Sequence, residues 1–419
     1  MKKIRVGVLG GYRGNAMIEY CKKAENAEVV AICDKSAYVL EKQKGREGAE
    51  NITFYDNFND FIKHDFDAVV LANYATEHAP FAIKALNAGK HVYSEVLPCQ
   101  TLKEAVELIE AVEKSGLVYA YGENYCYMSA PREMKKLYRE GKIGEFEYGE
   151  GEYIHNCEPL WPSITYGDEN HWRNNMYANF YCTHSIGPII HITGLRPVSV
   201  VGFESKITER KLRQGSKSGL FGIEMITLEN GGIIKSIHGD LYKNSVWYSV
   251  YGSKGRMESA REDAGDDFVN TLYVNADNYS GEYPEDKKAI KYKPQMNDLA
   301  KKFGHAGSDF YPMYNFIEKI KGNPDADCID VYEALDMFLP GLMAYRSVLK
   351  GGVPVEVPNL RLKSERDKYR FDVACTDKKI AGDQVIPVFS LGNPEIPKET
   401  YNAVKKEWER RVADKEIPY

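Results

Sequence analysis

The sequence has no long hydrophobic run and no strong excess of either charge. Its longest apolar stretches, such as residues 68–72, are far too short to cross a bilayer. The net charge is −6 without any basic cluster, so nothing attracts nucleic acid or an anionic membrane. The opening residues, Met-Lys-Lys-Ile-Arg-Val, lack the apolar segment of a secretory signal. We therefore expect a cytoplasmic protein whose partners include neither nucleic acid nor a membrane.

Metal-binding and serine-nucleophile motifs are also missing. None of the eight cysteines lies in a Cys-x-x-Cys pair, and no His-Glu-x-x-His occurs. We therefore expect reduced thiols and no metal. No Gly-x-Ser-x-Gly elbow supports serine hydrolysis. The length of 419 residues allows two domains.

The first part of the chain alternates between buried strands and helices. Strand patterns at residues 4–9, 27–33 and 66–72 are separated by helical patterns, one of them at residues 102–114. This alternation is typical of an α/β fold with a doubly wound, mostly parallel sheet, whose ligands bind at the carboxyl ends of the strands. We predict an N-terminal Rossmann domain over residues 1–125.

A glycine-rich loop follows the first strand and reads Gly10-Gly11-Tyr12-Arg13-Gly14. Gly11 and Gly14 keep the last spacing of the dinucleotide fingerprint Gly-x-Gly-x-x-Gly, although Leu9 takes its first place. Such a loop lets a pyrophosphate approach the backbone at a helix N-terminus. We expect all five loop residues to contact a dinucleotide.

Asp34 stands at the end of the second strand, where the fingerprint has an acidic residue. A carboxylate there accepts hydrogen bonds from the ribose diol and repels a 2′-phosphate, which favours NAD over NADP. Lys35 beside it keeps NADP open as an alternative. Asp34 could also serve as a helix N-cap.

From residue 126 onward the pattern changes to short strands separated by turn residues. We predict that residues 126–419 form a substrate-binding α+β domain with an open, mainly antiparallel sheet, helices on one face and a C-terminal tail. A segment at residues 158–175 is rich in Trp, Pro, Tyr and Asn and is expected to line a pocket. The expected strands are residues 144–155, 197–204, 223–228, 232–241 and 245–251.

Residues 67–78 read Asp-Ala-Val-Val-Leu-Ala-Asn-Tyr-Ala-Thr-Glu-His, and residues 85–95 read Ala-Leu-Asn-Ala-Gly-Lys-His-Val-Tyr-Ser-Glu. Both segments resemble the Gfo/Idh/MocA oxidoreductases, dinucleotide-dependent enzymes that act mainly on sugars and cyclitols. The resemblance implies that Asn73, His78 and Glu95 lie at the cofactor, with Glu95 also able to contact the sugar. It further implies a homodimer or higher homo-oligomer.

One departure from that family matters for the chemistry. Its Glu-Lys-Pro carries a lysine that usually assists proton transfer, but Val96 stands in the lysine's place. Together with four further segments, this departure resembles the branch that contains NAD-dependent α-N-acetylgalactosaminidase-like glycosidases. Those segments are Tyr153-Ile154-His155-Asn156, Trp172-Arg173, Thr183-His184-Ser185-Ile186-Gly187-Pro188 and Gly304-His305-Ala306-Gly307-Ser308-Asp309.

The branch implies a hidden redox cycle. Bound NAD⁺ takes hydride from carbon 3 of the sugar, and the resulting ketone acidifies the C–H bond at carbon 2. The aglycone then leaves by elimination, water adds, and the hydride returns. The protein must therefore supply an acid/base for the hydroxyl, a base for the carbon acid and groups that hold the sugar.

We assign the proton relay at the oxidised hydroxyl to His184, because an imidazole titrates near neutral pH. Tyr181 could share its pocket. Tyr153 and His155 have the same parity on one strand and could serve as the base at carbon 2 and as a sugar contact. For each of them, ordinary packing is the alternative.

Three further residues are candidates for binding the sugar. Arg173 could clamp a substrate oxygen with its fork of donors, and a surface ion pair is the alternative. Trp172 precedes it, and His305 lies among small residues before a helical run.

The leading functional hypothesis is an NAD-dependent enzyme that oxidises a sugar or glycoside at carbon 3 and ends in glycosidic cleavage. The first alternative is a simple sugar or cyclitol dehydrogenase. The second is a sensor that binds the dinucleotide without turnover, an option that Val96 keeps open.

Overall fold

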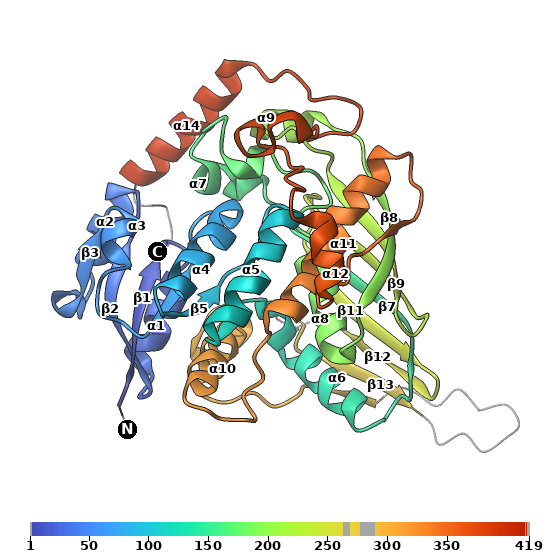
Figure 1. The fold of residues 1–419 in the computed structure, drawn as a ribbon. Coiled ribbons are helices and arrows are strands. Elements are labelled where there is room, and N and C mark those ends of the chain that lie inside the picture. Colours follow the sequence, from blue (N-terminus) through green and yellow to red (C-terminus); the bar gives the residue numbers. More distant parts are fainter. Residues whose placement is uncertain (1, 263–268, 277–289, 415, 417–419) are drawn as a thin grey trace, which may run out of the picture.

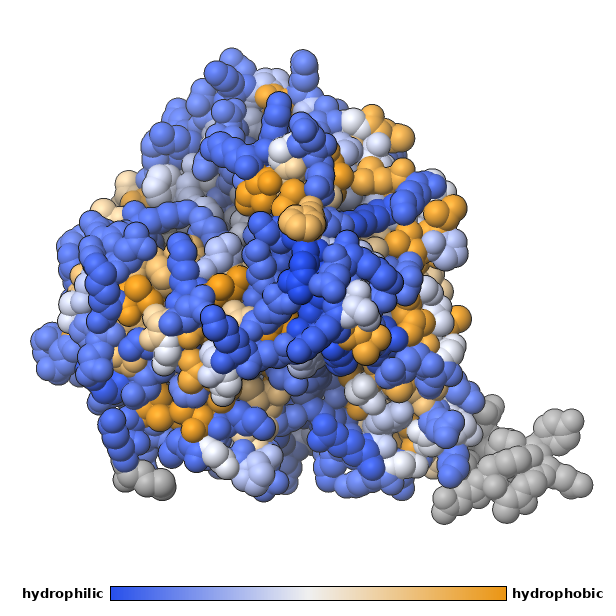
Figure 2. All heavy atoms as spheres, in the orientation of Figure 1, coloured by the Kyte–Doolittle hydropathy of each residue, from blue (hydrophilic) through white to orange (hydrophobic). Residues whose placement is uncertain are grey.

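The computed structural model describes residues 2–262, 269–276, 290–414 and 416. Two sheets lie side by side, each covered by helices, with the N-terminal part of the chain forming one half of the molecule and a larger sheet the other (Figure 1). Hydrophilic residues cover most of the face shown in Figure 2. Among the described residues, no helix combines the length and the apolar content that crossing a membrane requires.

The first sheet has six parallel strands in the order β3-β2-β1-β4-β5-β6. Its central strands are buried on both faces, which explains their continuous apolar sequences, such as Ala-Val-Val-Leu in β4. The predicted Rossmann topology is confirmed. The strands are β1 (Ile4–Leu9), β2 (Ala27–Cys33), β3 (Thr53–Tyr55), β4 (Ala68–Leu71), β5 (His91–Ser94) and β6 (Tyr119–Tyr121). The helices between them are α1 (Asn15–Lys23), α2 (Ala37–Lys44), α3 (Phe58–Phe61), α4 (His78–Asn87) and α5 (Leu102–Ser115).

The second sheet has nine strands in the order β14-β13-β12-β11-β7-β10-β9-β8-β15. All its neighbours pair antiparallel except β7 and β10, which run parallel. The predicted open, mainly antiparallel sheet is thus confirmed. The strands are β7 (Phe146–Ile154), β8 (Pro197–Glu204), β9 (Phe221–Leu228), β10 (Ile233–Gly239), β11 (Ser245–Gly252), β12 (Gly255–Ser259), β13 (Leu272–Ala276), β14 (Ile290–Tyr292) and β15 (Val355–Glu356).

Helices α6 (Ser129–Arg139), α8 (Thr183–Thr193) and α11 (Val331–Leu349) cover one face of this sheet. Burial alternates residue by residue along β9, so one face of the sheet meets helices. The other helices of the second half are α7 (Trp161–Thr165), α9 (Glu209–Gln214), α10 (Phe310–Ile320), α12 (Lys363–Tyr369), α13 (Lys378–Ala381) and α14 (Lys398–Ala413).

Helix α8 lies unusually close to strand β7. A Cβ atom on Gly151 of β7 would stand 1.8 Å from the carbonyl oxygen of Ser185, so no other residue fits there without movement. This close approach sets the N-terminal turn of α8, and with it His184, against the sheet.

Helix α10 comes late in the sequence but packs on the first domain. Phe316 lies 5.8 Å from Tyr93 between ring centroids, and Asn26 donates a hydrogen bond to Glu318. Phe310, the first residue of α10, contacts Tyr20 of α1. The N-terminus of α10 therefore reaches the carboxyl-end edge of the parallel sheet.

Candidate active site

The glycine loop after β1 makes the close turn that a dinucleotide needs. Gly10 has φ +93°, and a Cβ there would lie 2.4 Å from the Ala72 carbonyl oxygen. A Cβ on Gly14 would lie 2.4 Å from the Gly10 carbonyl oxygen. Helix α1 begins at Asn15, directly after this turn. The loop thus brings bare backbone to a helix N-terminus at the carboxyl ends of the strands, as pyrophosphate binding requires.

Asp34 is held in place at the same edge. Its two carboxylate oxygens accept hydrogen bonds from the backbone N–H groups of Gly11 and Ser36, each at 2.8 Å. Burial raises the pKa of this carboxyl, and the two N–H groups oppose that shift. The side chain of Ser36 caps helix α2, so the N-cap role considered for Asp34 belongs to Ser36.

Lys35 is engaged elsewhere. Its Nζ lies 3.5 Å from the ring centroid of Tyr74 and 3.6 Å from a carboxylate oxygen of Glu77. A lysine committed to these partners is poorly placed to recruit a 2′-phosphate, which agrees with NAD.

Asn73 and His78 both follow β4, but their side chains contact different partners. Asn73 donates from its amide to Glu77, while its buried Oδ1 has no hydrogen-bond partner among the described residues. Such an orphaned acceptor fits a ligand hydroxyl. His78 is buried, and its Nδ1 lies 2.8 Å from the Leu97 carbonyl oxygen. Burial lowers the pKa of His78 to about 4, so the ring is neutral and supports the loop after β5.

The centre of the site is a carboxylate–histidine pair that joins the two domains. Glu123, fully buried just after β6, places Oε1 2.7 Å from Nδ1 of His184. Its other oxygen accepts a hydrogen bond from the Thr183 hydroxyl at 2.8 Å. A carboxylate at Nδ1 favours the tautomer with the proton on that nitrogen, in which Nε2 carries the lone pair that can accept a proton.

Three tyrosines surround the His184 ring. The centroids of Tyr125, Tyr153 and Tyr181 lie 4.5, 4.7 and 5.2 Å from it. The two predicted tyrosines are therefore brought to His184. Burial raises the pKa of the Tyr153 phenol well above its ordinary range, which favours a hydrogen-bond donor over a base.

His155 and Arg173 extend the cluster. The His155 ring lies 6.0 Å from Tyr153, and burial lowers its pKa, so the neutral imidazole can accept a proton. The guanidinium carbon of Arg173 lies 4.4 Å from the centroid of a Trp172 ring and 5.3 Å from that of Tyr181. The structure thus places both expected members of the Trp-Arg pair beside the histidine cluster.

His305 is held by a second carboxylate. Its Nδ1 lies 2.9 Å from Oδ2 of Asp309, and its ring faces Tyr125 at 6.2 Å. His305 and Ala306 both have positive φ, of 49° and 53°. Backbone strain of this kind is concentrated at functional sites.

Arg13 connects the glycine loop to this second histidine. One guanidinium nitrogen donates to Glu95 Oε1 at 3.0 Å and to Asp309 Oδ1 at 3.3 Å. Asn124 also donates to Asp309 Oδ1, at 2.8 Å. Burial raises the pKa of Asp309, but Arg13 and His305 outweigh it and hold that pKa below the ordinary range. Glu95 and Arg13, both predicted at the cofactor, therefore meet between the two domains.

Sequence reasoning missed Glu123 and Tyr125, and gave Asp309 no role. Glu123 directly follows the last parallel strand, and strand carboxyl ends are where this fold binds ligands, so its position was a usable signal. Tyr125 offered none, because its ring contacts join segments far apart in the sequence. Asp309 did carry a local signal, since it lies four residues after His305 in the segment 304–309.

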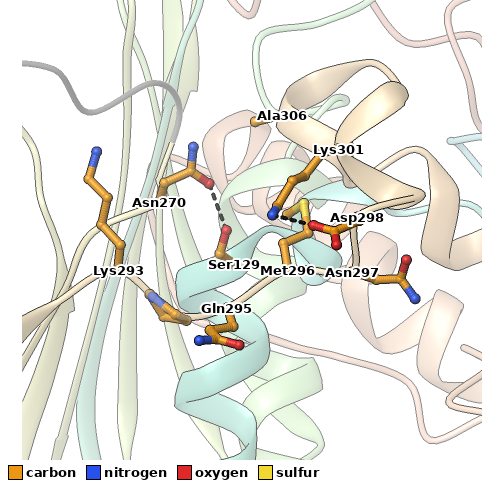
Figure 3. Close-up of a pocket in the computed structure, with 10 residues that line it drawn as sticks. Ser129, Asn270, Lys293, Gln295, Met296, Asn297, Asp298, Lys301 and Ala306 are labelled. Carbon is orange, nitrogen blue, oxygen red and sulfur yellow. Dashed lines mark hydrogen bonds and ion pairs between the residues drawn. The ribbon is translucent and has the colours of Figure 1, made fainter.

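Two cavities border the site. One of about 340 Å³ lies against the glycine loop and is lined by Tyr12, Arg13, Gly304 and Asp309 among others. Another, of about 780 Å³, opens beside α6 and is lined by Ser129, Asn270 and Lys301, with Ala306 at its rim (Figure 3). The larger cavity holds none of the histidines, so size alone does not mark the reacting centre. Within the described residues, no group of His, Cys, Asp and Glu side chains could hold a metal ion.

A dinucleotide-binding Rossmann domain, joined through a buried Glu–His pair to a second sheet domain, defines a two-domain enzyme of the oxidoreductase type. Residues 4–123 match the oxidoreductase family with an NAD-binding Rossmann fold, Gfo/Idh/MocA. Residues 243–364 match the C-terminal domain of glycosyl hydrolase 109. The chain thus combines the NAD-binding domain of the Gfo/Idh/MocA oxidoreductases with the C-terminal domain of the glycosyl hydrolase 109 family. The predicted resemblance and the predicted cofactor, NAD, are confirmed.

Individual relatives agree with both domains. A glycosyl hydrolase family 109 protein of Solibacter usitatus is 27% identical over 397 residues, covering 85% of this chain and 88% of its own. One from Shewanella is 31% identical over 202 residues, covering 45% of this chain and 44% of its own. Among solved structures, a myo-inositol 2-dehydrogenase of Lactobacillus plantarum has a TM-score of 0.65 at 22% identity. That match covers 85% of this chain and 100% of the other, and it shows the shared fold.

Proposed function

We propose that this chain is an NAD-dependent enzyme that acts on a sugar or glycoside at carbon 3 and cleaves the glycosidic bond without net oxidation. The observation that carries the proposal is the buried Glu123–His184 pair, 2.7 Å apart, at the carboxyl end of the parallel sheet. Val96 stands in the place of the family's usual lysine and cannot move a proton, so we assign the acid/base role to the His184 imidazole.

NAD⁺, when bound, supplies the hydride acceptor. His184 takes the proton of the sugar hydroxyl on Nε2, and the Glu123 carboxylate stabilises the imidazolium that forms. Because Glu123 is fully buried, its negative charge is poorly screened by water and acts strongly on the ring.

The proton on carbon 2 needs a separate base. His155 suits this role better than Tyr153, because burial keeps the imidazole neutral but opposes the phenolate. Tyr153 then donates a hydrogen bond, and Tyr181 shares the same wall of the pocket.

The remaining residues hold the sugar. Arg173 presents its donors from between two aromatic rings, Trp172 among them. His305, oriented by Asp309, and Glu95, paired with Arg13, contact the sugar from the side of the glycine loop.

The test is an incubation of the purified protein with NAD⁺ and a panel of aryl glycosides and free sugars. Aglycone release without accumulation of NADH is the expected result. NADH formation without aglycone release would instead establish the dehydrogenase alternative. Binding of NAD⁺ with neither product across the panel would establish the sensor.

We also propose that the protein works as a homo-oligomer in the cytoplasm. The open second sheet presents half-exposed apolar residues, including Val201, Ile223 and Met225, on the face away from the helices. The eight free thiols of the protein suit a reducing compartment such as the cytoplasm.

A further inference from the structure

A continuous series of ring contacts runs from the C-terminal helix to the nucleotide-binding edge. Trp408 of α14 lies 5.3 Å from Tyr166, Tyr166 lies 6.1 Å from His171, and His171 lies 4.6 Å from Tyr74, all between ring centroids. Tyr74 follows strand β4 of the first domain. We call these four residues the aromatic strap.

The inner end of the aromatic strap lies beside the residue that selects the ribose. Nζ of Lys35 lies over the ring of Tyr74, 3.5 Å from its centroid, and Lys35 directly follows Asp34 in the sequence. Burial first, and then the charge of Asp34, raises the pKa of the Tyr166 phenol to about 12. Burial lowers the pKa of His171 to about 3, so its ring is neutral. The strap therefore presents uncharged aromatic faces near Asp34.

The outer end is fixed to helix α14. The turn that follows α7 at Tyr166 and Gly167 packs directly on α14. A Cβ on Gly167 would stand 2.5 Å from the backbone nitrogen of Lys405. Arg411 donates a hydrogen bond to the Pro159 carbonyl oxygen at 2.7 Å. In Figure 1, α14 lies along α7 and α9, and its end points toward the first domain. The turn and α14 thus form one packed unit.

We propose that Tyr74, Tyr166 and His171 form the wall of the cofactor site on its adenosine side, and that Trp408 holds this wall closed. Adenine stacks on aromatic faces, and aromatic pairs stabilise one another beyond the effect of the area they bury. Release of NAD⁺ then requires α14 to separate from the loop that carries Tyr166. An enzyme that regenerates its cofactor in each cycle has no need for rapid release. This inference rests on the proposed function only through the bound NAD⁺.

The test compares NAD⁺ dissociation from the full-length protein and two variants. Trp408→Ala removes the outer support. Tyr166→Asn removes a ring but suits the positive φ of 57° at that position, because Asn tolerates the left-handed region. The control is Glu409→Ala, an exposed neighbour on the same helix. Dissociation is followed by stopped-flow displacement with excess ADP-ribose, and melting temperatures check folding.

We expect both strap variants to release NAD⁺ roughly three- to tenfold faster, as the loss of one aromatic contact implies, with the control unchanged. If both folded variants bound NAD⁺ normally and released it at the parent rate, the proposed role of the aromatic strap would be wrong. An equal acceleration in Glu409→Ala would overturn it too. If the parent protein bound no NAD⁺ at all, the proposed function would fall and the strap with it.

Discussion

Glu123 Oε1 lies 2.7 Å from His184 Nδ1, and these two residues come from different domains. Glu123 follows the last strand of the parallel sheet, whereas His184 opens α8 on the second sheet. The tautomer of the His184 imidazole is therefore set by a carboxylate from the nucleotide-binding half of the molecule. Any shift of one domain against the other would change the distance between Oε1 and Nδ1.

We expect His184→Ala to lower the rate of aglycone release by roughly 10²- to 10⁴-fold, the usual contribution of a general acid/base. Glu123→Gln should cause a smaller loss, because the imidazole stays but its cation loses a carboxylate. Calorimetric titration should show unchanged NAD⁺ affinity in both variants. His64→Ala, which removes a half-buried histidine of the first domain, is the control. A rate unaffected by His184→Ala would remove this residue from the catalytic machinery.

Asp34→Ser should weaken NAD⁺ binding by roughly 10- to 100-fold, because hydrogen bonds to a charged group contribute about 1.5–3 kcal/mol. The preference over NADP⁺ should fall in parallel, since no carboxylate remains to repel a 2′-phosphate. Titrations with both dinucleotides measure the effect, and Glu50→Gln on the exposed surface serves as the control. An unchanged NAD⁺/NADP⁺ ratio would contradict the assignment.

Asp309 is a positioning residue, because it holds His305 from one side and Arg13 from the other. Asp309→Asn and His305→Ala should each lower kcat/KM by roughly tenfold or more, mainly through KM. If Asp309 acts through His305, the loss of kcat/KM in the double variant should be no larger than the loss in the more impaired single variant. Losses that multiply would show that Asp309 acts independently of the histidine.

Glu104 makes stability depend on pH. It is buried at the start of α5 and accepts a hydrogen bond from the Gln100 N–H, and burial raises its pKa from 4.5 to about 7. The folded state thus binds this proton more tightly than the unfolded state, so stability should fall as the pH rises from about 4.5 through about 7.

Glu104→Gln keeps the acceptor and removes the titration. At pH 8 we expect this variant to be more stable than the parent by roughly 3 kcal/mol, and at pH 4.5 about equally stable. Denaturant unfolding at both pH values measures the difference. Glu107→Gln, exposed on the same helix, should show no such gain. A Glu104→Gln gain that did not change with pH would refute the explanation.

Most of the first domain could be predicted because its main elements have strong local signals, whereas the short β3 and α3 were not predicted. The apolar run of β4 and the glycine loop before α1 need no distant partner to be recognised. The parallel pairing of β7 with β10 carried no such signal, because strand direction depends on the route of the connection rather than on the strands themselves. For the same reason, nothing local assigned α10 to the first domain.

Local sequence segments singled out the histidines of the candidate site but not Glu123, which contacts one of them. His184 and His305 lie in recognisable segments, and Asp309 lies four residues after His305 in one of them. Glu123 lies in no such segment, and its contact with His184 joins residues 61 positions apart. Asp34 shows the converse case. Its place at a strand end was a sufficient signal for its position, because the fold brings that position to the carboxyl-end edge of the parallel sheet.

The position of α10 has a consequence for how this protein reaches its native state. During folding, the aromatic surface around Tyr20 and Tyr93 remains exposed to solvent until residues 310–320 pack on it. A fragment that ends near residue 125 would expose this aromatic surface to solvent and would therefore tend to aggregate. During synthesis, about three-quarters of the chain must be made before α10 can cover the surface.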